Sequence, residues 1–249
     1  MMCSHFNNNE YMLGTWAEIP SPYVSHVMMT AGFDFSIIDL EHGVIDFETT
    51  QNMIFASHAV NKKAYVRVPA IEESWALRVL DMQCDGIIFP QVSSSKQIEK
   101  IIDYCCFAPK GQRGFNPYIT AGGYNKVSED YYDSENERIQ IGVILEGKDA
   151  FNNIESLLRF DEVKIIYIGQ YDLSMALGIP GQVDNPKVLD LMNKAVKSIR
   201  ESGKMAGCMV HSPEEAKRFI QIGFQFVVYQ VDTGLLSNTI KNFVEEVKR

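Results

Sequence analysis

The chain has 249 residues, of which 46% are hydrophobic and 22% are charged, and its formal net charge at pH 7 is −9. This length suits one large α/β barrel or two small domains. The acidic balance, without a basic stripe, argues against nucleic acid or an anionic membrane as the main partner. No apolar run approaches the ~20 residues of a transmembrane helix. Residues 1–12 are polar and lack the apolar core of a signal peptide, so we expect a loose N-terminal tail on a cytoplasmic protein.

The five cysteines are odd in number and form no C-x-x-C motif, which is typical of reduced thiols in a cytosolic protein. Adjacent cysteines do not have metal-ligand spacing, and most buried free cysteines behave as small hydrophobic side chains. We therefore do not expect a catalytic thiol. The five residues are Cys3, Cys84, Cys105, Cys106 and Cys208.

Eight short apolar runs of strand type follow one another along the chain. Their shortness and their abrupt polar ends favour buried parallel strands. The second run shows this most clearly, because it ends in Asp39, Glu41 and His42 and is followed by Gly43. In chain order, we expect strands at residues 13–18, 35–39, 64–68, 86–89, 139–145, 163–168, 205–209 and 226–229.

Helical segments separate these runs. Pro22, Pro186 and Pro213 stand where helices are expected to begin, which is a favoured position for proline. Residues 169–172 are expected to form a loop that precedes a short helix from residue 173. The other expected helices are residues 22–31, 46–60, 74–83, 95–106, 151–160, 185–202, 212–223 and 235–247.

Eight strands, each followed by a helix, over about 250 residues predict one domain, a (β/α)8 TIM barrel formed by residues 1–249. A Rossmann sheet is disfavoured because no G-x-G-x-x-G motif follows any strand. Residues 107–137 form one long irregular stretch that is rich in glycine, proline and tyrosine. Its aromatic content favours a structured active-site or interface loop over disorder.

Polar side chains follow several of the expected strands, at the end where a barrel enzyme carries its active site. They are Asp39, Glu41 and His42 after the second strand, Arg67 near the end of the third, Gln91 after the fourth, Glu146 after the fifth and Asp172 after the sixth. In a barrel these side chains converge on one mouth, although they are far apart in the sequence.

Three features of this mouth each have a functional and a structural interpretation. Glu146 and Asp172 suit a hard divalent cation such as Mg²⁺ or Mn²⁺, but each could instead cap a helix. Arg67 lies in an apolar strand and needs an anionic partner, either a structural carboxylate or a substrate oxyanion. His42 could act as an oriented general base, or it could be a loop histidine satisfied by local carboxylates.

An ordered set of motifs resembles the HpcH/HpaI aldolase family, the metal-dependent class II pyruvate aldolases. This family includes the 2,4-dihydroxyhept-2-ene-1,7-dioate and 2-keto-3-deoxy sugar acid aldolases. The resemblance extends from about Leu13 to the closing helix and implies a barrel of the phosphoenolpyruvate/pyruvate-domain type. The motifs are Leu13-Gly14-Thr15-Trp16, Ile38-Asp39-Leu40-Glu41-His42, Val66-Arg67-Val68-Pro69, Lys110-Gly111-Gln112-Arg113-Gly114, Leu145-Glu146, Ile168-Gly169-Gln170-Tyr171-Asp172-Leu173-Ser174 and Val231-Asp232-Thr233.

The resemblance implies a lyase that reversibly cleaves a 4-hydroxy-2-oxo acid to pyruvate, or a similar 2-oxo acid, and an aldehyde. By this resemblance, Glu146 and Asp172 would bind a divalent metal (Mg²⁺, Mn²⁺ or Co²⁺). His42, oriented by Asp39, would handle the proton, and Arg67 would stabilise the enolate oxyanion. The remaining implied site residues, which would contact the substrate, are Trp16, Gly169, Gln170, Tyr171 and, from a neighbouring subunit, Asp81.

The resemblance also implies a homo-oligomer, a hexamer or a trimer-based assembly, in which residues 235–249 form a helix exchanged between subunits. Two departures from the family pattern alter the expected pocket wall. Ile144 stands where family members commonly have glutamine, and Gln170-Tyr171 stands where they usually have Pro-Ala. The identity of the aldehyde is therefore not predicted.

Two alternatives to the aldolase remain. One is a related enolate chemistry, such as oxaloacetate decarboxylation or citrate-lyase-like carbon–carbon cleavage. The other is a non-catalytic barrel. This alternative is disfavoured because the sequence retains all four candidate catalytic residues, His42, Arg67, Glu146 and Asp172.

Overall fold

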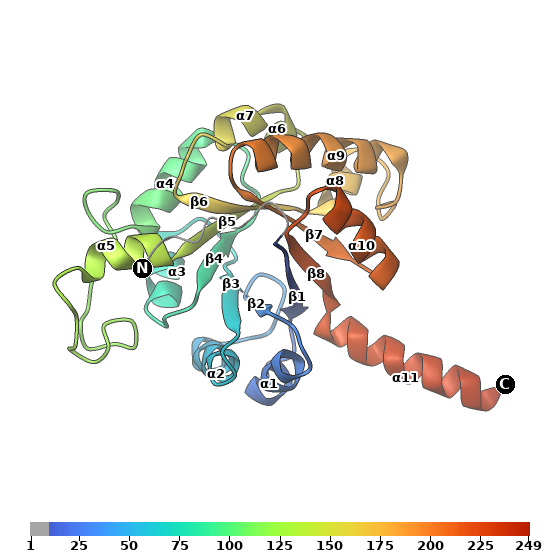
Figure 1. The fold of residues 1–249 in the computed structure, drawn as a ribbon, viewed down its shortest axis with the longest axis horizontal. Coiled ribbons are helices and arrows are strands. Elements are labelled where there is room, and N and C mark those ends of the chain that lie inside the picture. Colours follow the sequence, from blue (N-terminus) through green and yellow to red (C-terminus); the bar gives the residue numbers. More distant parts are fainter. Residues whose placement is uncertain (1–9) are drawn as a thin grey trace.

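The chain folds into a closed barrel of eight parallel strands in the order β1 to β8, as predicted (Figure 1). The computed structural model describes residues 10–249, so most of the predicted N-terminal tail lies outside the described residues. The strands are β1 (Met12–Ala17), β2 (Phe35–Asp39), β3 (Lys63–Arg67), β4 (Gly86–Phe89), β5 (Gln140–Leu145), β6 (Val163–Ile168), β7 (Met205–Val210) and β8 (Phe226–Val231).

Helices surround the barrel and complete the (β/α)8 TIM fold. Ser21, Asn185 and Ser212 each accept a hydrogen bond from a first-turn N–H of the helix that follows, and a proline stands next in the chain. The helices before the long loop are α1 (Pro22–Thr30), α2 (Phe47–His58), α3 (Glu73–Leu80) and α4 (Ser95–Cys105). Those after it are α5 (Tyr131–Arg138), α6 (Lys148–Asn152), α7 (Ile154–Leu157), α8 (Gln170–Ala176), α9 (Pro186–Glu201), α10 (Pro213–Ile222) and α11 (Asp232–Lys248).

Three predicted segments differ from the structure. The irregular stretch ends earlier than predicted, because Tyr131–Arg138 forms α5, where Arg138 donates to the Glu135 carboxylate one turn before it. The helix predicted at 151–160 is two short helices, α6 and α7, divided at Asn153, which has φ −99° and ψ 5°. The loop predicted at 169–172 instead forms the start of α8, with Gly169 as its N-cap.

Aromatic side chains close the amino-terminal end of the barrel. Phe35 and Phe226 stack with their ring centroids 4.0 Å apart, and Tyr65 meets both rings edge-on. Gly14 leaves room for this packing, since a Cβ there would lie 2.4 Å from the Phe35 ring. Because these side chains fill this end, we expect a ligand to enter at the carboxyl ends of the strands.

The described residues contain no helix that is long and apolar enough to cross a membrane. The four described cysteines, Cys84, Cys105, Cys106 and Cys208, are free and buried, in agreement with the sequence analysis; Cys3 lies outside the described residues. Helix α11 leaves the barrel after β8 and extends away from it (Figure 1).

Candidate active site

A cavity of about 530 Å³ opens at the carboxyl ends of the strands. Its lining comes from β1, β3, β5, β6, β7 and β8, from residues that follow these strands and β2, and from α8 and α11. Trp16 and Tyr167 meet edge-on within it, with ring centroids 5.5 Å apart, and Trp16 Nε1 donates to the Tyr167 hydroxyl at 3.1 Å. These two side chains join the cavity to the packed interior of the barrel.

The predicted acidic pair lies on one side of the cavity. Glu146 follows β5 directly, and Asp172 lies in the first turn of α8. The Gln91 backbone N–H donates to Glu146 Oε1 at 2.6 Å, from a residue held in the left-handed region at φ 55°. Gly169 lies close to Glu146, since a Cβ at this position would lie 3.0 Å from Glu146 Cβ.

The neighbouring Asp172 carboxylate disfavours the charged state of Glu146. Burial, together with the neighbouring Asp172 carboxylate, raises the pKa of Glu146 to about 7, although the Gln91 N–H opposes this shift. A bound cation would reverse the effect, because it stabilises the charged form of each acid.

The donor set of this acidic pair fits a hard divalent cation, because carboxylate oxygens are the ligands that Mg²⁺ and Mn²⁺ prefer. The helix N-caps are Gly147 and Gly169, and no side-chain capping bond forms at either, so the capping alternative is not supported. Within residues 10–249, no group of three or more His, Cys, Asp or Glu side chains could hold a metal ion by itself. Water and substrate oxygens would have to complete the coordination of a cation held by Glu146 and Asp172.

Arg67 is fixed at the cavity wall by two carboxylates. Its Nε and Nη2 donate to the two carboxylate oxygens of Asp39 at 2.8 and 2.5 Å, and its Nη1 lies 2.9 Å from Glu41 Oε2. Its guanidinium lies 4.3 Å from the centroid of the Trp16 ring. Burial lowers the pKa of Arg67, but the paired carboxylates outweigh this and raise it, so the side chain stays charged. Arg67 therefore has the structural carboxylate partner that was one of its two predicted alternatives, and its guanidinium also lines the cavity.

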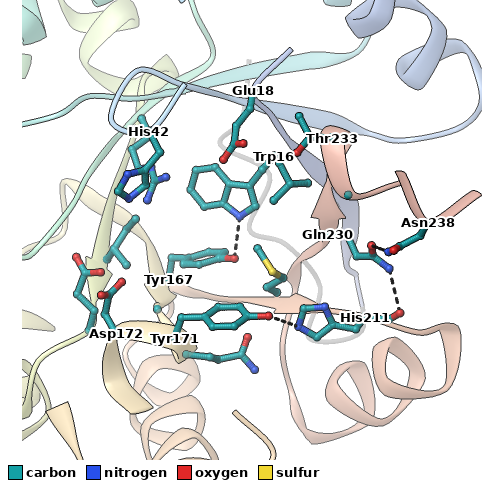
Figure 2. A pocket seen from close by; sticks show the side chains of 18 residues that line it. Trp16, Glu18, His42, Tyr167, Tyr171, Asp172, His211, Gln230, Thr233 and Asn238 are labelled. Atoms are coloured by element: carbon teal, nitrogen blue, oxygen red, sulfur yellow. Dashed lines mark hydrogen bonds between the residues drawn. The ribbon is translucent and has the colours of Figure 1, made fainter. Parts of the chain in front are cut away.

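His42 lines the same cavity, on the side where Asp172 lies (Figure 2). Asp39 Oδ1 accepts the backbone N–H groups of Glu41 at 3.0 Å and His42 at 3.3 Å. Asp39 thus contacts the loop that carries His42 through backbone N–H groups, and its orientation of the His42 side chain stays a prediction. Within residues 10–249, the Asp39 oxygens accept from Arg67 and from these N–H groups and not from the His42 imidazole.

Two predicted site residues do not line the cavity in the described part of the chain: Asp39 is buried and contacts Arg67, and the other is Asp81. It is the C-cap of α3, and its carboxylate lies 3.5 Å from Nη2 of Arg113, a buried guanidinium from the long loop. Burial raises the pKa of Asp81, and Arg113 opposes this shift. A role for Asp81 in the site of a neighbouring subunit stays a prediction.

Several lining residues were not identified from the sequence. Glu18 follows β1 and His211 follows β7, so the rule that located the other side chains at strand ends could have found both. Tyr167 lies within β6, and Asn238 lies in α11, more than one turn from its start. No sequence signal marked these two residues.

A closed parallel barrel with an acidic pair, a guanidinium and a histidine at its carboxyl end has the architecture of a TIM-barrel enzyme. A model of the HpcH/HpaI aldolase/citrate lyase family matches residues 12–239, so the chain belongs to this family. It is an enzyme of the carbon–carbon lyase class, as the sequence analysis predicted.

Individual relatives agree with this assignment. The chain is 28% identical to a hydroxypyruvate/pyruvate aldolase of Roseobacter denitrificans, over 98% of this chain and 95% of the relative. It is 26% identical to a 2-keto-3-deoxy-L-rhamnonate aldolase of Escherichia coli O1:K1, over 93% of this chain and 86% of the relative. The crystal structure of an HpcH/HpaI aldolase from Desulfitobacterium hafniense DCB-2 has the same fold, with a TM-score of 0.92 and 23% identity over 97% of this chain and 94% of that chain.

Proposed function

We propose that the protein is a divalent-metal-dependent aldolase that reversibly cleaves a 4-hydroxy-2-oxo acid to pyruvate, or a similar 2-oxo acid, and an aldehyde. The observation that carries this proposal is the convergence of Glu146, Asp172, Arg67 and His42 on one cavity. Membership of a family whose relatives include named pyruvate and keto-acid aldolases supports it.

Glu146 and Asp172 would hold the cation (Mg²⁺, Mn²⁺ or Co²⁺), which when bound supplies a Lewis acid for the 2-oxo group. The backbone N–H groups around Tyr171 and Asp172 would receive the carboxylate of the 2-oxo acid. Arg67 would stand beside the C2 oxygen and stabilise the negative charge that develops there. Because Asp39 and Glu41 already fix its guanidinium, little reorganisation would be needed during the reaction.

In the cleavage direction, the C4 hydroxyl loses its proton while the C3–C4 bond breaks and its electron pair moves to C3. The aldehyde then leaves, and the enolate takes up a proton at C3 to give pyruvate. His42 lies on the same side of the cavity as Asp172, where it could accept the hydroxyl proton (Figure 2). Trp16 and Tyr167 would shield the enolate from bulk water.

We extend the proposal to a homo-oligomer in which α11 packs against a second copy of the chain. The apolar side chains of α11 are exposed in the isolated subunit, and Phe243 is 67% exposed. The other exposed apolar residues of this helix are Leu236, Ile240, Val244 and Val247. The direction of α11, away from its own barrel, leaves these side chains free to contact another subunit (Figure 1).

The proposal is tested by measuring pyruvate release from a panel of 4-hydroxy-2-oxo acids, with oxaloacetate included for the decarboxylase alternative. Protein stripped with EDTA should be inactive, and Mg²⁺, Mn²⁺ or Co²⁺ should restore release. Glu146→Gln and Asp172→Asn should abolish the metal-dependent rate, whereas Glu155→Gln, at an exposed carboxylate of α7, should not change it. Turnover that survives EDTA treatment and both substitutions would refute the metal site.

A further inference from the structure

The wall opposite the acidic pair is polar and, among the described residues, carries no carboxylate, lysine or arginine. Figure 2 shows His42 and Asp172 on one side of the cavity and His211, Gln230 and Asn238 on the other. A group that extends across the cavity from a 2-oxo acid held at Glu146 and Asp172 would face this second side. The three side chains come from the end of β7, from β8 and from α11.

Hydrogen bonds hold this wall together. Gln230, at φ 53°, donates from Nε2 to the His211 carbonyl at 3.2 Å and accepts from Asn238 Nδ2 at 3.2 Å. The Tyr171 hydroxyl lies 3.5 Å from His211 Nε2, with the two rings edge-on. A non-glycine residue held in the left-handed region by two side-chain hydrogen bonds indicates a built surface rather than a variable loop.

The side chain of Gln170 adds a hydrogen-bond acceptor to this wall, and no donor in the described chain bonds to it. Its side chain lines the cavity and is only 3% exposed, and its Oε1 accepts no hydrogen bond from residues 10–249. A buried amide oxygen without a partner is costly, so a ligand or water that donates a hydrogen bond would be stabilised there. Gln170 is also one of the positions where this chain departs from the family pattern.

The charge of the cavity restricts which ligand can approach this wall. Within residues 10–249, the lining contains no lysine and no arginine other than Arg67, whose guanidinium is paired with Asp39 and Glu41. The carboxylate of Glu18 also lines the cavity (Figure 2). A carboxylate or phosphate at the far end of a substrate would therefore find no free lysine or arginine in the described lining and would be repelled by Glu18.

We propose that the wall formed by Gln170, Tyr171, His211, Gln230 and Asn238 binds the aldehyde half of the substrate, and that this half is uncharged and hydroxylated. A hydroxyl can donate to Gln170 Oε1 or Glu18 and can accept from Tyr171 or Asn238, whereas an ionised carboxylate can only accept. This inference rests on the proposed aldolase function and names its substrate class: 4-hydroxy-2-oxo acids with further hydroxyls beyond C4 and no anionic group at the distal end.

The test runs the reaction in the condensation direction with pyruvate, metal-loaded protein and three aldehydes of equal carbon number. These are glyceraldehyde, propionaldehyde and glyceraldehyde 3-phosphate, at pH 8, where an ordinary imidazole is neutral. We expect kcat/KM for glyceraldehyde to exceed that for each of the other two by about tenfold or more, since a site built for hydroxyl groups rejects analogues that lack them. Equal or faster use of propionaldehyde or the phosphate ester would overturn the proposal.

Two variants examine the contacts directly. Asn238→Leu should raise KM for glyceraldehyde while leaving KM for propionaldehyde at or below the wild-type value, which a merely structural defect would not do. Glu18→Gln should raise kcat/KM for glyceraldehyde 3-phosphate relative to glyceraldehyde. Changes that are the same for all three aldehydes would contradict the assignment of this wall.

Deuterium exchange at the pyruvate methyl group, measured without any aldehyde, distinguishes a failure of the acceptor proposal from a failure of the proposed aldolase function. If exchange proceeds with metal but the aldehyde preference is reversed, only the acceptor proposal fails. If exchange is absent with every metal, the aldolase function itself fails, and the acceptor proposal falls with it.

Discussion

Arg67 is the residue whose geometry most constrains the proposed chemistry. Its guanidinium donates to both oxygens of Asp39, contacts Glu41 and lies over Trp16, so its position is fixed on three sides. Lysine would keep the positive charge, but it could reproduce neither the two parallel hydrogen bonds nor the flat contact with the indole.

We therefore predict that Arg67→Lys lowers kcat by about 10²–10³-fold, as the loss of a preorganised oxyanion donor does in other enzymes. The measurement is steady-state pyruvate release with the best substrate of the panel, with circular dichroism to confirm the fold. Arg78→Lys is the matched control, because Arg78 contacts the Phe47 ring on the outside of the barrel. A fall in kcat of less than about threefold would exclude the proposed role of Arg67.

Glu146 couples metal binding to pH. Its pKa is raised to about 7 without a cation, so metal has to displace a proton at lower pH. Since the folded-state pKa exceeds its ordinary value, the protonated acid stabilises the metal-free fold at low pH, and this contribution is lost as pH rises through about 7.

Metal affinity should therefore weaken by up to about tenfold per pH unit below pH 7 and level off above it. Calorimetric titration with Mn²⁺ between pH 5.5 and 8.5 measures this dependence, and proton release should accompany binding at the lower values. The Glu146→Gln variant should bind weakly at every pH. An affinity of the wild-type protein that does not change over this range would contradict the assignment.

At the scale of single residues, the strand-end rule located Arg67, Glu146 and Asp172 from sequence, because a parallel barrel brings all strand ends to one mouth. The same rule did not identify Gln230 or Asn238. Gln230 reaches the cavity through a backbone with positive φ, and Asn238 reaches it from a helix whose start depends on the end of β8. Such contacts depend on tertiary geometry that local patterns do not encode.

Among the elements, the strands were predicted more accurately than the segments between them. Strands β2, β4 and β6 have the predicted bounds, because each is a short apolar run that ends at a polar residue, a proline or a glycine. Helix α8 was predicted to start at residue 173, but it includes Gln170 and Tyr171. This difference matters, because it places Asp172 in the first turn of a helix, where the positive end of the helix dipole stabilises a carboxylate.

Helix α11 gives a prediction about assembly. Replacing Ile240 and Phe243 by serine removes exposed apolar area that a second copy would bury, and should shift the protein from an oligomer towards a monomer. Size-exclusion chromatography with light scattering measures the shift. Lys241→Ser provides a control at an exposed, charged position of the same helix. A wild-type protein that is monomeric at micromolar concentration would contradict the proposed packing of α11.

In the molecule as a whole, the tightly packed side chains and the candidate catalytic residues lie at opposite ends of the barrel axis. The Phe35, Tyr65 and Phe226 cluster fills the amino-terminal end, while Trp16 and Tyr167 form the boundary between this interior and the cavity. Residues of the open end can therefore carry charge and unsatisfied polar atoms without weakening the packed end. This division is consistent with a family fold in which residues of the cavity wall can vary without disturbing the packed end.

The central claim is that metal held by Glu146 and Asp172 promotes formation of a pyruvate enolate, and hydrogen–deuterium exchange tests it most directly. Pyruvate is incubated in D₂O with EDTA-stripped protein, with and without Mg²⁺, Mn²⁺ or Co²⁺, and methyl deuteration is followed by mass spectrometry. We predict exchange that requires both protein and metal and is abolished in Glu146→Gln. No exchange above the protein-free rate with any of these metals, in folded protein, would contradict the account.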